Sequence, residues 1–190
     1  MSWQEVLQRH PIIPAVRRDQ DLDAALRSPA AAIFLLNGSL LSLPRVVEQC
    51  HAAGKAVFVH YDLIEGLSGD RAGVEFLARY VGPDGLITTR SSVARYSLDA
   101  GMETVLRIFA LDSGALATAL QVVRRTGPGA VEVLPACLPA WVFAELRRVH
   151  RGPLVAGGLV RTSDDALRAL AAGATAVSAS NPALWSMEVS

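Results

Sequence analysis

The amino-acid sequence predicts an α/β fold, a compact TIM-barrel-like (β/α)8 barrel that spans residues 1–190 as one domain and begins with a short lead-in of residues 1–10. Short apolar segments alternate with helical segments along the chain, which is the pattern of repeated βα units. The apolar segments are almost continuously hydrophobic, as expected for parallel strands covered on both sides. The last two run into Gly-rich and Ser-rich loops, where such barrels usually bind phosphate.

Composition limits the size of the barrel and its surroundings. The chain has 190 residues, of which 51% are hydrophobic, whereas a typical barrel of this class has about 250 residues. The loops must therefore be short. No apolar run is long enough to span a membrane, the start of the chain is not typical of a signal peptide, and Cys50 and Cys137 lack metal-like spacing. We expect a cytoplasmic protein with no membrane contact, bound metal or cofactor.

Eight apolar runs predict the strands. These runs are Ile12–Val16, Ala32–Leu36, Ala56–His60, Gly85–Thr88, Thr104–Phe109, Ala130–Leu134, Leu154–Ala156 and Ala174–Ser178. A doubly wound open sheet is the competing fold, but it favours a Gly-rich fingerprint after the first strand. That position holds Val16-Arg17-Arg18 instead, so the barrel is favoured.

Seven segments between the strands carry helix signals. They are Asp19–Arg27, Leu43–Ala53, Asp70–Val81, Ser91–Ala100, Ser113–Thr126, Pro139–His150 and Ser163–Ala172, and a last helical turn begins at Pro182. Three of these helices end at an Ala-Gly pair, where glycine tolerates the left-handed conformation that terminates a helix: Ala53-Gly54, Ala100-Gly101 and Ala172-Gly173. The predicted N-caps are Asp19, Ser91 and Ser163.

The loops after the last two strands predict a phosphate site. Gly157 and Gly158 follow one strand, and Ser178 and Ser180 lie at the end of the next. Glycine lets backbone N–H groups approach an anion closely, and a helix that begins just beyond adds a positive dipole end. Gly-Gly alone is more often a simple turn. The two loops in the order of a phosphate-binding barrel favour the site.

Polar residues at the ends of the other strands are candidate ligand contacts, since the carboxyl ends of barrel strands carry the chemistry. They are Asn37, His60, Asp62, Glu65, Arg107 and Glu132. Arg107 and Glu132 lie inside apolar runs of adjacent strands, so we expect them to pair in the barrel mouth. That pair is either structural or a ligand contact. His60 can equally be a core histidine, and Asp62 and Glu65 can bind hydroxyls or a metal or cap a helix.

Arginines supply almost all the positive charge, and they divide between the two ends of the barrel. Arg17, Arg18, Arg90 and Arg161 belong to the loop end and are candidate RNA-binding residues. A second group lies near helix C-termini at the opposite end, where arginines complement the helix dipole: Arg124, Arg125, Arg147, Arg148 and Arg151. The formal net charge of zero argues against nonspecific nucleic-acid binding but leaves room for a local basic patch.

A barrel enzyme of the isomerase or lyase class acting on a small phosphorylated substrate is the alternative function, with Glu132 or His60 as general base. Schiff-base aldolase chemistry is excluded. It needs a lysine late on a strand, and the one lysine, Lys55, precedes its strand.

An ordered set of segments resembles the glycerol uptake operon antiterminators, a family responsive to glycerol 3-phosphate. The segments cover the chain from His10 to Trp185: Pro11–Arg17, Ile33–Gly38, Val59–Leu67, Pro83–Thr89, Leu111–Ser113, Glu132–Pro135, Ala156–Leu159 and Ser178–Asn181. Three positions depart from the family pattern, which tends to have a lysine at Arg90, a glycine at Ala136 and a threonine at Ala179.

The resemblance implies a cytoplasmic, non-catalytic barrel that binds the leader of glycerol-operon mRNA. In response to glycerol 3-phosphate, the small phosphorylated metabolite that acts as effector, such a protein prevents premature transcription termination. The ligand phosphate is then expected on Gly157, Gly158, Ser178 and Ser180, with the hydroxyls held by residues at the other strand ends.

Overall fold

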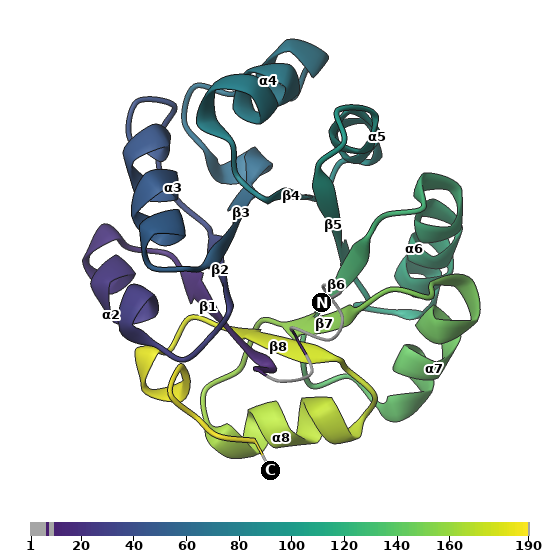
Figure 1. Cartoon of the computed structure of the whole chain (residues 1–190). Helices are drawn as coiled ribbons and strands as arrows, with labels where there is room; N and C mark the ends of the chain where they lie inside the picture. Colours follow the sequence, from purple (N-terminus) through teal and green to yellow (C-terminus); the bar gives the residue numbers. More distant parts are fainter. Residues whose placement is uncertain (1–6, 8–9, 190) are drawn as a thin grey trace.

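The protein folds as a closed barrel of eight parallel strands that follow one another in sequence order (Figure 1). The computed structural model describes Leu7 and residues 10–189. The strands are β1 Ile12–Val16, β2 Ala32–Leu35, β3 Ala56–His60, β4 Gly85–Thr88, β5 Glu103–Phe109, β6 Ala130–Leu134, β7 Leu154–Gly157 and β8 Ala176–Ala179. The predicted (β/α)8 barrel is confirmed.

Helices form a ring around the barrel (Figure 1). They are η1 Asp19–Asp21, α2 Leu22–Arg27, α3 Leu43–Ala52, α4 Arg71–Phe76, α5 Ser91–Asp99, α6 Ser113–Thr126, α7 Ala140–Val149 and α8 Ser163–Ala171. Short helical turns complete the set: η2 Tyr61–Leu63, the π-helical η3 Leu77–Val81, and η4 Pro182–Leu184. The glycines at the three Ala-Gly pairs have φ angles of +71°, +75° and +117°, so they end their helices as predicted.

The predicted N-caps are wrong by one residue. Asp19, Ser91 and Ser163 are the first residues of η1, α5 and α8, and the preceding residue takes the cap position in each case. At α8 the reason is a capping box. The Thr162 hydroxyl accepts from the N–H of Asp165, while the Asp165 carboxylate accepts from the N–H of Thr162.

Two apolar layers hold the barrel. Leu7, Ile13, Phe34, Phe58 and Val105 belong to a cluster inside the strands. A larger cluster lies between the strands and the helices, because successive strand residues point to opposite faces. Residues two positions beyond an inner residue therefore point into the barrel as well.

That alternation places polar side chains inside the barrel mouth. The inner apolar residues Phe58, Val105, Ala130 and Ala176 are followed two positions later by four polar ones: His60, Arg107, Glu132 and Ser178. On these four strands the inward-facing side chains therefore change from apolar to polar at the carboxyl end. The interior is a packed core below and a polar site above.

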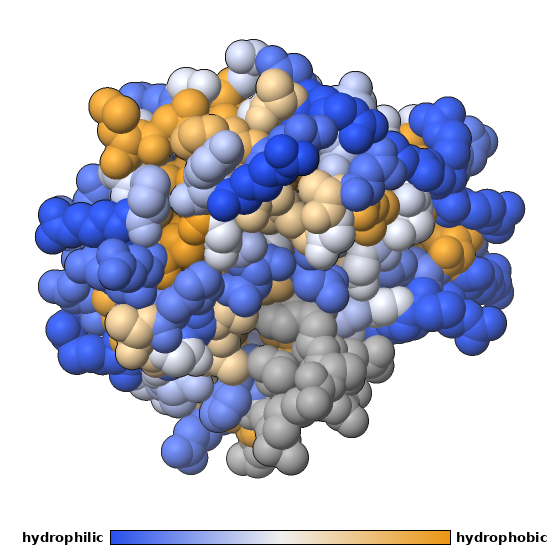
Figure 2. Space-filling model, turned by 45° about the horizontal axis from the view of Figure 1, so that its top comes forward, coloured by the Kyte–Doolittle hydropathy of each residue, from blue (hydrophilic) through white to orange (hydrophobic). Residues whose placement is uncertain are grey.

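Charged and other hydrophilic side chains cover much of the outer surface. Figure 2 shows one side of the molecule, on which hydrophilic side chains prevail and hydrophobic ones gather in separate patches. Among the described residues, no helix combines the length and hydropathy needed to cross a membrane.

Candidate functional site

A cavity of about 460 Å³ opens at the carboxyl ends of the strands. Its polar wall combines residues from five strands or the loops that follow them: Arg17, Arg107, Glu132, Arg161, Ser178 and Ser180. Apolar side chains complete the lining, among them Leu36, Leu63, Leu134 and Leu159. A volume of this size suits a small metabolite.

Arg107 and Glu132 form a buried ion pair in this cavity, as the sequence predicts. They are direct partners in the β5–β6 register, and Arg107 Nε lies 2.6 Å from Glu132 Oε2. The other carboxylate oxygen, Oε1, accepts a 2.6 Å hydrogen bond from the Ser178 hydroxyl. Glu132 is only 1% exposed. Both carboxylate oxygens are therefore occupied, and the pair links β5, β6 and β8 across the mouth.

Gly157 leaves room for this arrangement. A Cβ atom at Gly157 would lie 2.6 Å from Glu132 Oε1 and 2.7 Å from the Ser178 hydroxyl oxygen, closer than real Cβ atoms approach. Any side chain at this position would displace the hydrogen bond between Glu132 and Ser178. Gly157 therefore does not line the cavity itself; it leaves the space in which Glu132 and Ser178 form their hydrogen bond.

Gly158 and the residues after it form the loop side of the cavity. Gly158 and Leu159 both have positive φ angles, +76° and +60°, so the chain turns sharply as it leaves β7. Asn181, which follows β8, donates a 3.0 Å hydrogen bond from Nδ2 to the carbonyl of Arg161 and joins the two loops. Asn181 was not among the predicted site residues, although it ends the Ser-Ala-Ser-Asn segment.

Two backbone N–H groups just before α8 are already engaged within the chain. The Asp165 carboxylate accepts hydrogen bonds from the backbone N–H groups of Arg161 and Thr162. These hydrogen bonds lower the pKa of Asp165. The N–H groups of Arg161 and Thr162 are therefore not free for an anion in the cavity, which leaves the loop before Arg161, the end of β8 and the arginine side chains as its candidate partners.

His60 lies in the polar layer, buried near Arg107. Only 2% of the residue is exposed, and its Nδ1 atom has no hydrogen-bond partner among the described residues. Burial lowers the pKa of His60 to about 4, and the positive charge of Arg107 adds to this effect. His60 is therefore neutral at ordinary pH.

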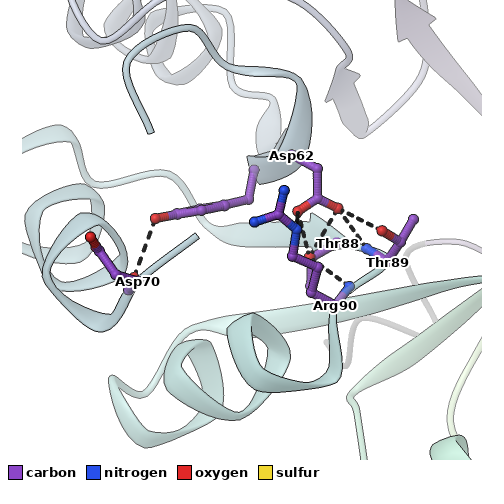
Figure 3. Close-up of polar contacts among 6 residues, drawn as sticks. Asp62, Asp70, Thr88, Thr89 and Arg90 are labelled. Carbon is purple, nitrogen blue, oxygen red and sulfur yellow. Dashed lines mark hydrogen bonds and ion pairs between the residues drawn. The ribbon is translucent and has the colours of Figure 1, made fainter. Parts of the chain in front are cut away.

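Asp62 is held by the neighbouring strand end (Figure 3). Its carboxylate accepts hydrogen bonds from the Thr88 hydroxyl at 3.0 Å and from the Thr89 N–H at 2.7 Å. Arg90 Nε lies 3.4 Å from the same carboxylate, and the Arg90 guanidinium packs against Gly69. Asp62 therefore fastens the loop after β3 to the loop after β4, and it does not line the cavity.

Asn37 and Glu65 also lie outside the cavity lining. Asn37 donates a 2.6 Å hydrogen bond to the Asp19 carboxylate. Glu65 forms an isolated parallel bridge with Ser39, through which the loop after β3 joins the loop after β2. The structure therefore brings Arg107, Glu132 and Ser178 together with Gly158 and Ser180. Outside this lining lie Gly157 and the other four predicted polar contacts: Asn37, His60, Asp62 and Glu65.

The four loop-end arginines have different surroundings. Arg17 and Arg161 line the cavity. Arg18 makes two hydrogen bonds to the Asp21 carboxylate, at 2.7 and 3.0 Å, and Arg90 is paired with Asp62. Two of the four therefore hold carboxylates of their own chain, and two are placed to meet a ligand.

Lys55 lies at the other end of the barrel. It precedes β3 and donates hydrogen bonds to the carbonyls of Ser28 and Ala30, at 2.5 and 2.8 Å. Burial lowers its pKa. This position separates the amine from the cavity and agrees with the exclusion of Schiff-base chemistry.

Comparison with known proteins identifies the family. The family model for the glycerol-3-phosphate responsive antiterminator matches residues 12–185. The chain belongs to this antiterminator family. A curated relative, the uncharacterized protein YgcP of Escherichia coli K12, is 32% identical to this chain. The alignment covers 98% of this chain and 97% of YgcP.

Solved structures agree with this membership. The glycerol uptake operon antiterminator regulatory protein of Listeria monocytogenes is 31% identical, with a TM-score of 0.87, over 93% of this chain and 95% of that one. An antiterminator-related protein of Thermotoga maritima is 30% identical, with a TM-score of 0.82, over 93% of this chain and 98% of that one. Aldolases at 12–16% identity share the barrel fold alone.

Replacing Glu132 with glutamine tests the buried pair. Glu132→Gln keeps an oxygen for Ser178 but leaves the Arg107 charge without its partner. Because breaking a buried ion pair costs about 3 to 5 kcal/mol, we expect the free energy of unfolding in urea to fall by that amount. Ligand affinity should fall too. A variant that loses stability but keeps ligand affinity would show that the pair is structural only.

Acid should destabilise the antiterminator through His60. The folded pKa, about 4, lies below the ordinary value of 6.5, so the unfolded state binds the proton first. This contribution to stability is complete above pH 6.5 and is lost as the pH falls towards 4. Between pH 7 and pH 5 the loss is about 2 kcal/mol.

Urea titrations of the wild type and His60→Leu at both pH values measure this loss. The variant should lose about 2 kcal/mol less than the wild type over the interval. Contributions from other groups, such as His150, are common to both proteins. Equal losses in the two proteins would contradict the proposed burial of a neutral His60.

Proposed function

We propose that the cavity binds glycerol 3-phosphate, with the phosphate at the loop side and the glycerol hydroxyls towards the Arg107–Glu132 pair. The observation that carries this proposal is the division of charge within the cavity. Arg17 and Arg161 have no carboxylate partner among the residues that the structure describes, and they lie beside Gly158, Ser178 and Ser180. Cations and closely approaching backbone are favourable for a phosphate.

The inner wall is suited to neutral hydroxyl groups. The charge of Arg107 is balanced by Glu132 at 2.6 Å, so this wall presents hydrogen-bonding atoms without net charge. Asn37, Asp62 and Glu65 satisfy other parts of the loops, which concentrates hydroxyl recognition on Arg107, Glu132 and Ser178. Gly157 supports this role by leaving space for the carboxylate.

In this proposal the protein is a non-catalytic cytoplasmic regulator that binds the mRNA leader of a glycerol operon and prevents premature transcription termination. The states of Glu132, in the cavity wall, and of His60, buried near Arg107, support binding without turnover. Efficient general bases have a pKa near the working pH and a free atom directed at the substrate. Both oxygens of Glu132 are already occupied, and the pKa of His60 is about 4.

Calorimetry with glycerol 3-phosphate, glycerol, inorganic phosphate and dihydroxyacetone phosphate tests the ligand. Glycerol 3-phosphate should bind more tightly than glycerol or phosphate alone, because each fragment meets only one wall. Analysis of the recovered ligand after prolonged incubation should find it unchanged. Consumption of any of these phosphates would instead support the alternative, a barrel enzyme of the isomerase or lyase class.

A negative charge placed at Gly158 should weaken phosphate binding. Gly158 has a φ angle of +76°, and aspartate and asparagine are the non-glycine residues that best tolerate this conformation. We expect Gly158→Asp to weaken glycerol 3-phosphate binding at least tenfold relative to Gly158→Asn, an increment of about 1.4 kcal/mol. The asparagine variant has nearly the same shape, so equal affinities by calorimetry would place the phosphate elsewhere.

A further inference from the structure

A groove of about 410 Å³ lies between α6 and α7, which are neighbours in the helical ring (Figure 1). Three arginines line it, Arg124 and Arg125 from the last turn of α6 and Arg148 from the last turn of α7. Leu120 and Val149 supply apolar lining. The groove therefore combines positive side chains with an apolar surface.

Positive charge is concentrated here although the chain is neutral overall. Residues 113–151 contain five arginines and two glutamates. One of these glutamates, Glu132, is buried against Arg107 and does not offset the surface charge. The other, Glu145, pairs with Arg148. Within the part of the chain that the structure describes, no ion pair involves Arg124 or Arg125.

Two arginines near the groove, Arg147 and Arg95, have different roles. Arg147 points inward, where it donates hydrogen bonds to the Gly152 carbonyl at 2.6 Å and the Thr175 hydroxyl at 2.8 Å. Arg95 of α5 donates a 2.9 Å hydrogen bond to the carbonyl of Arg125. This bond brings a further guanidinium to the end of α6 and satisfies one of the helix's last carbonyls.

We propose that this α6–α7 groove, rather than the mouth of the barrel, is the RNA-contact surface of the protein. The proposal rests on the proposed RNA-binding function and assigns it a location. Arg18 and Arg90 at the mouth hold carboxylates, and Arg17 and Arg161 line the ligand cavity. Arg124 and Arg125 are exposed, and neither holds a carboxylate among the described residues.

The chemistry of the groove matches a single-stranded RNA segment. Guanidinium groups bind phosphate oxygens in a bidentate fashion, and they also stack on bases. Proteins that bind single strands commonly combine a positive groove with apolar or aromatic surface for the bases. Here Arg124 and Arg125 meet phosphates, while Leu120 and Val149 pack against a base or ribose.

The groove and the ligand cavity share two βα units. Arg107 lies on β5, which is followed by α6, and Glu132 lies on β6, which is followed by α7. A ligand that contacts the ion pair therefore touches the two strands that lead to the helices of the groove. The effector and the RNA would therefore contact separate surfaces of the same two βα units.

RNA binding at different salt concentrations tests the location. The probe is a fluorescein-labelled transcript of the glycerol-operon leader from the genome that encodes this chain, measured by anisotropy with and without glycerol 3-phosphate. The variant is Arg124→Gln/Arg125→Gln. Because each single-strand phosphate contact contributes about −0.7 to the log–log salt slope, losing two contacts should make the slope shallower by about 1.4.

Arg79→Gln/Arg168→Gln is the matched control, since it also removes two exposed arginines, both of which are paired with carboxylates. It should leave the salt slope unchanged. Glycerol 3-phosphate affinity, measured by calorimetry, should stay at the wild-type value in both double variants and so shows that the barrel is folded.

The outcomes separate this inference from the proposed function. If the wild type binds no leader RNA in either condition, the RNA-binding function fails and the groove with it. If the wild type binds RNA and the groove variant keeps the full slope, only the location is overturned. Loss of the slope in Arg17→Gln/Arg161→Gln alone would then assign the RNA contact to the mouth.

Discussion

The Arg107–Glu132 ion pair is the constraint on which the functional end of this barrel depends. Two opposite charges on adjacent strands are stable inside a barrel only in direct register and with their remaining lone pairs satisfied. The structure meets both conditions, through the β5–β6 pairing and the hydrogen bond from Ser178. Gly157 has no side chain because the carboxylate occupies that space, and the charge of Arg107 helps to keep His60 neutral. The cavity lies above this unit.

The sequence predicted side-chain positions well where the two-residue alternation of a strand determines which way a side chain points. Strand residues alternate between two faces, so an arginine or a glutamate within an apolar run must point either into the barrel or against the helices. Neither position tolerates a lone charge, which made the pairing of Arg107 with Glu132 predictable. The Ala-Gly pairs were readable for a similar reason, since the left-handed end of a helix is a backbone demand that glycine meets locally.

Side chains in the loops were less predictable, because their partners depend on how neighbouring loops meet. Asp62 follows its strand just as a ligand-binding carboxylate would, yet it is satisfied by Thr88 and Thr89 from the next strand. Asn37 similarly donates its hydrogen bond to Asp19, which lies in the connection between β1 and β2. Residue type and position at a strand end select candidates for the site. Only the three-dimensional arrangement shows which of them remain available to a ligand.

The arginines illustrate the same point for charge. A net charge of zero counts every side chain equally, but a carboxylate that holds an arginine removes it from long-range attraction, whereas a distant carboxylate does not. At the mouth, Arg18 and Arg90 are neutralised within contact distance. At the ends of α6 and α7, the acidic residue that lines the groove, Glu145, is engaged by Arg148, and Arg124 and Arg125 face solvent. The balance of charge in the whole chain therefore conceals a local excess, and it is the local field that an RNA backbone meets.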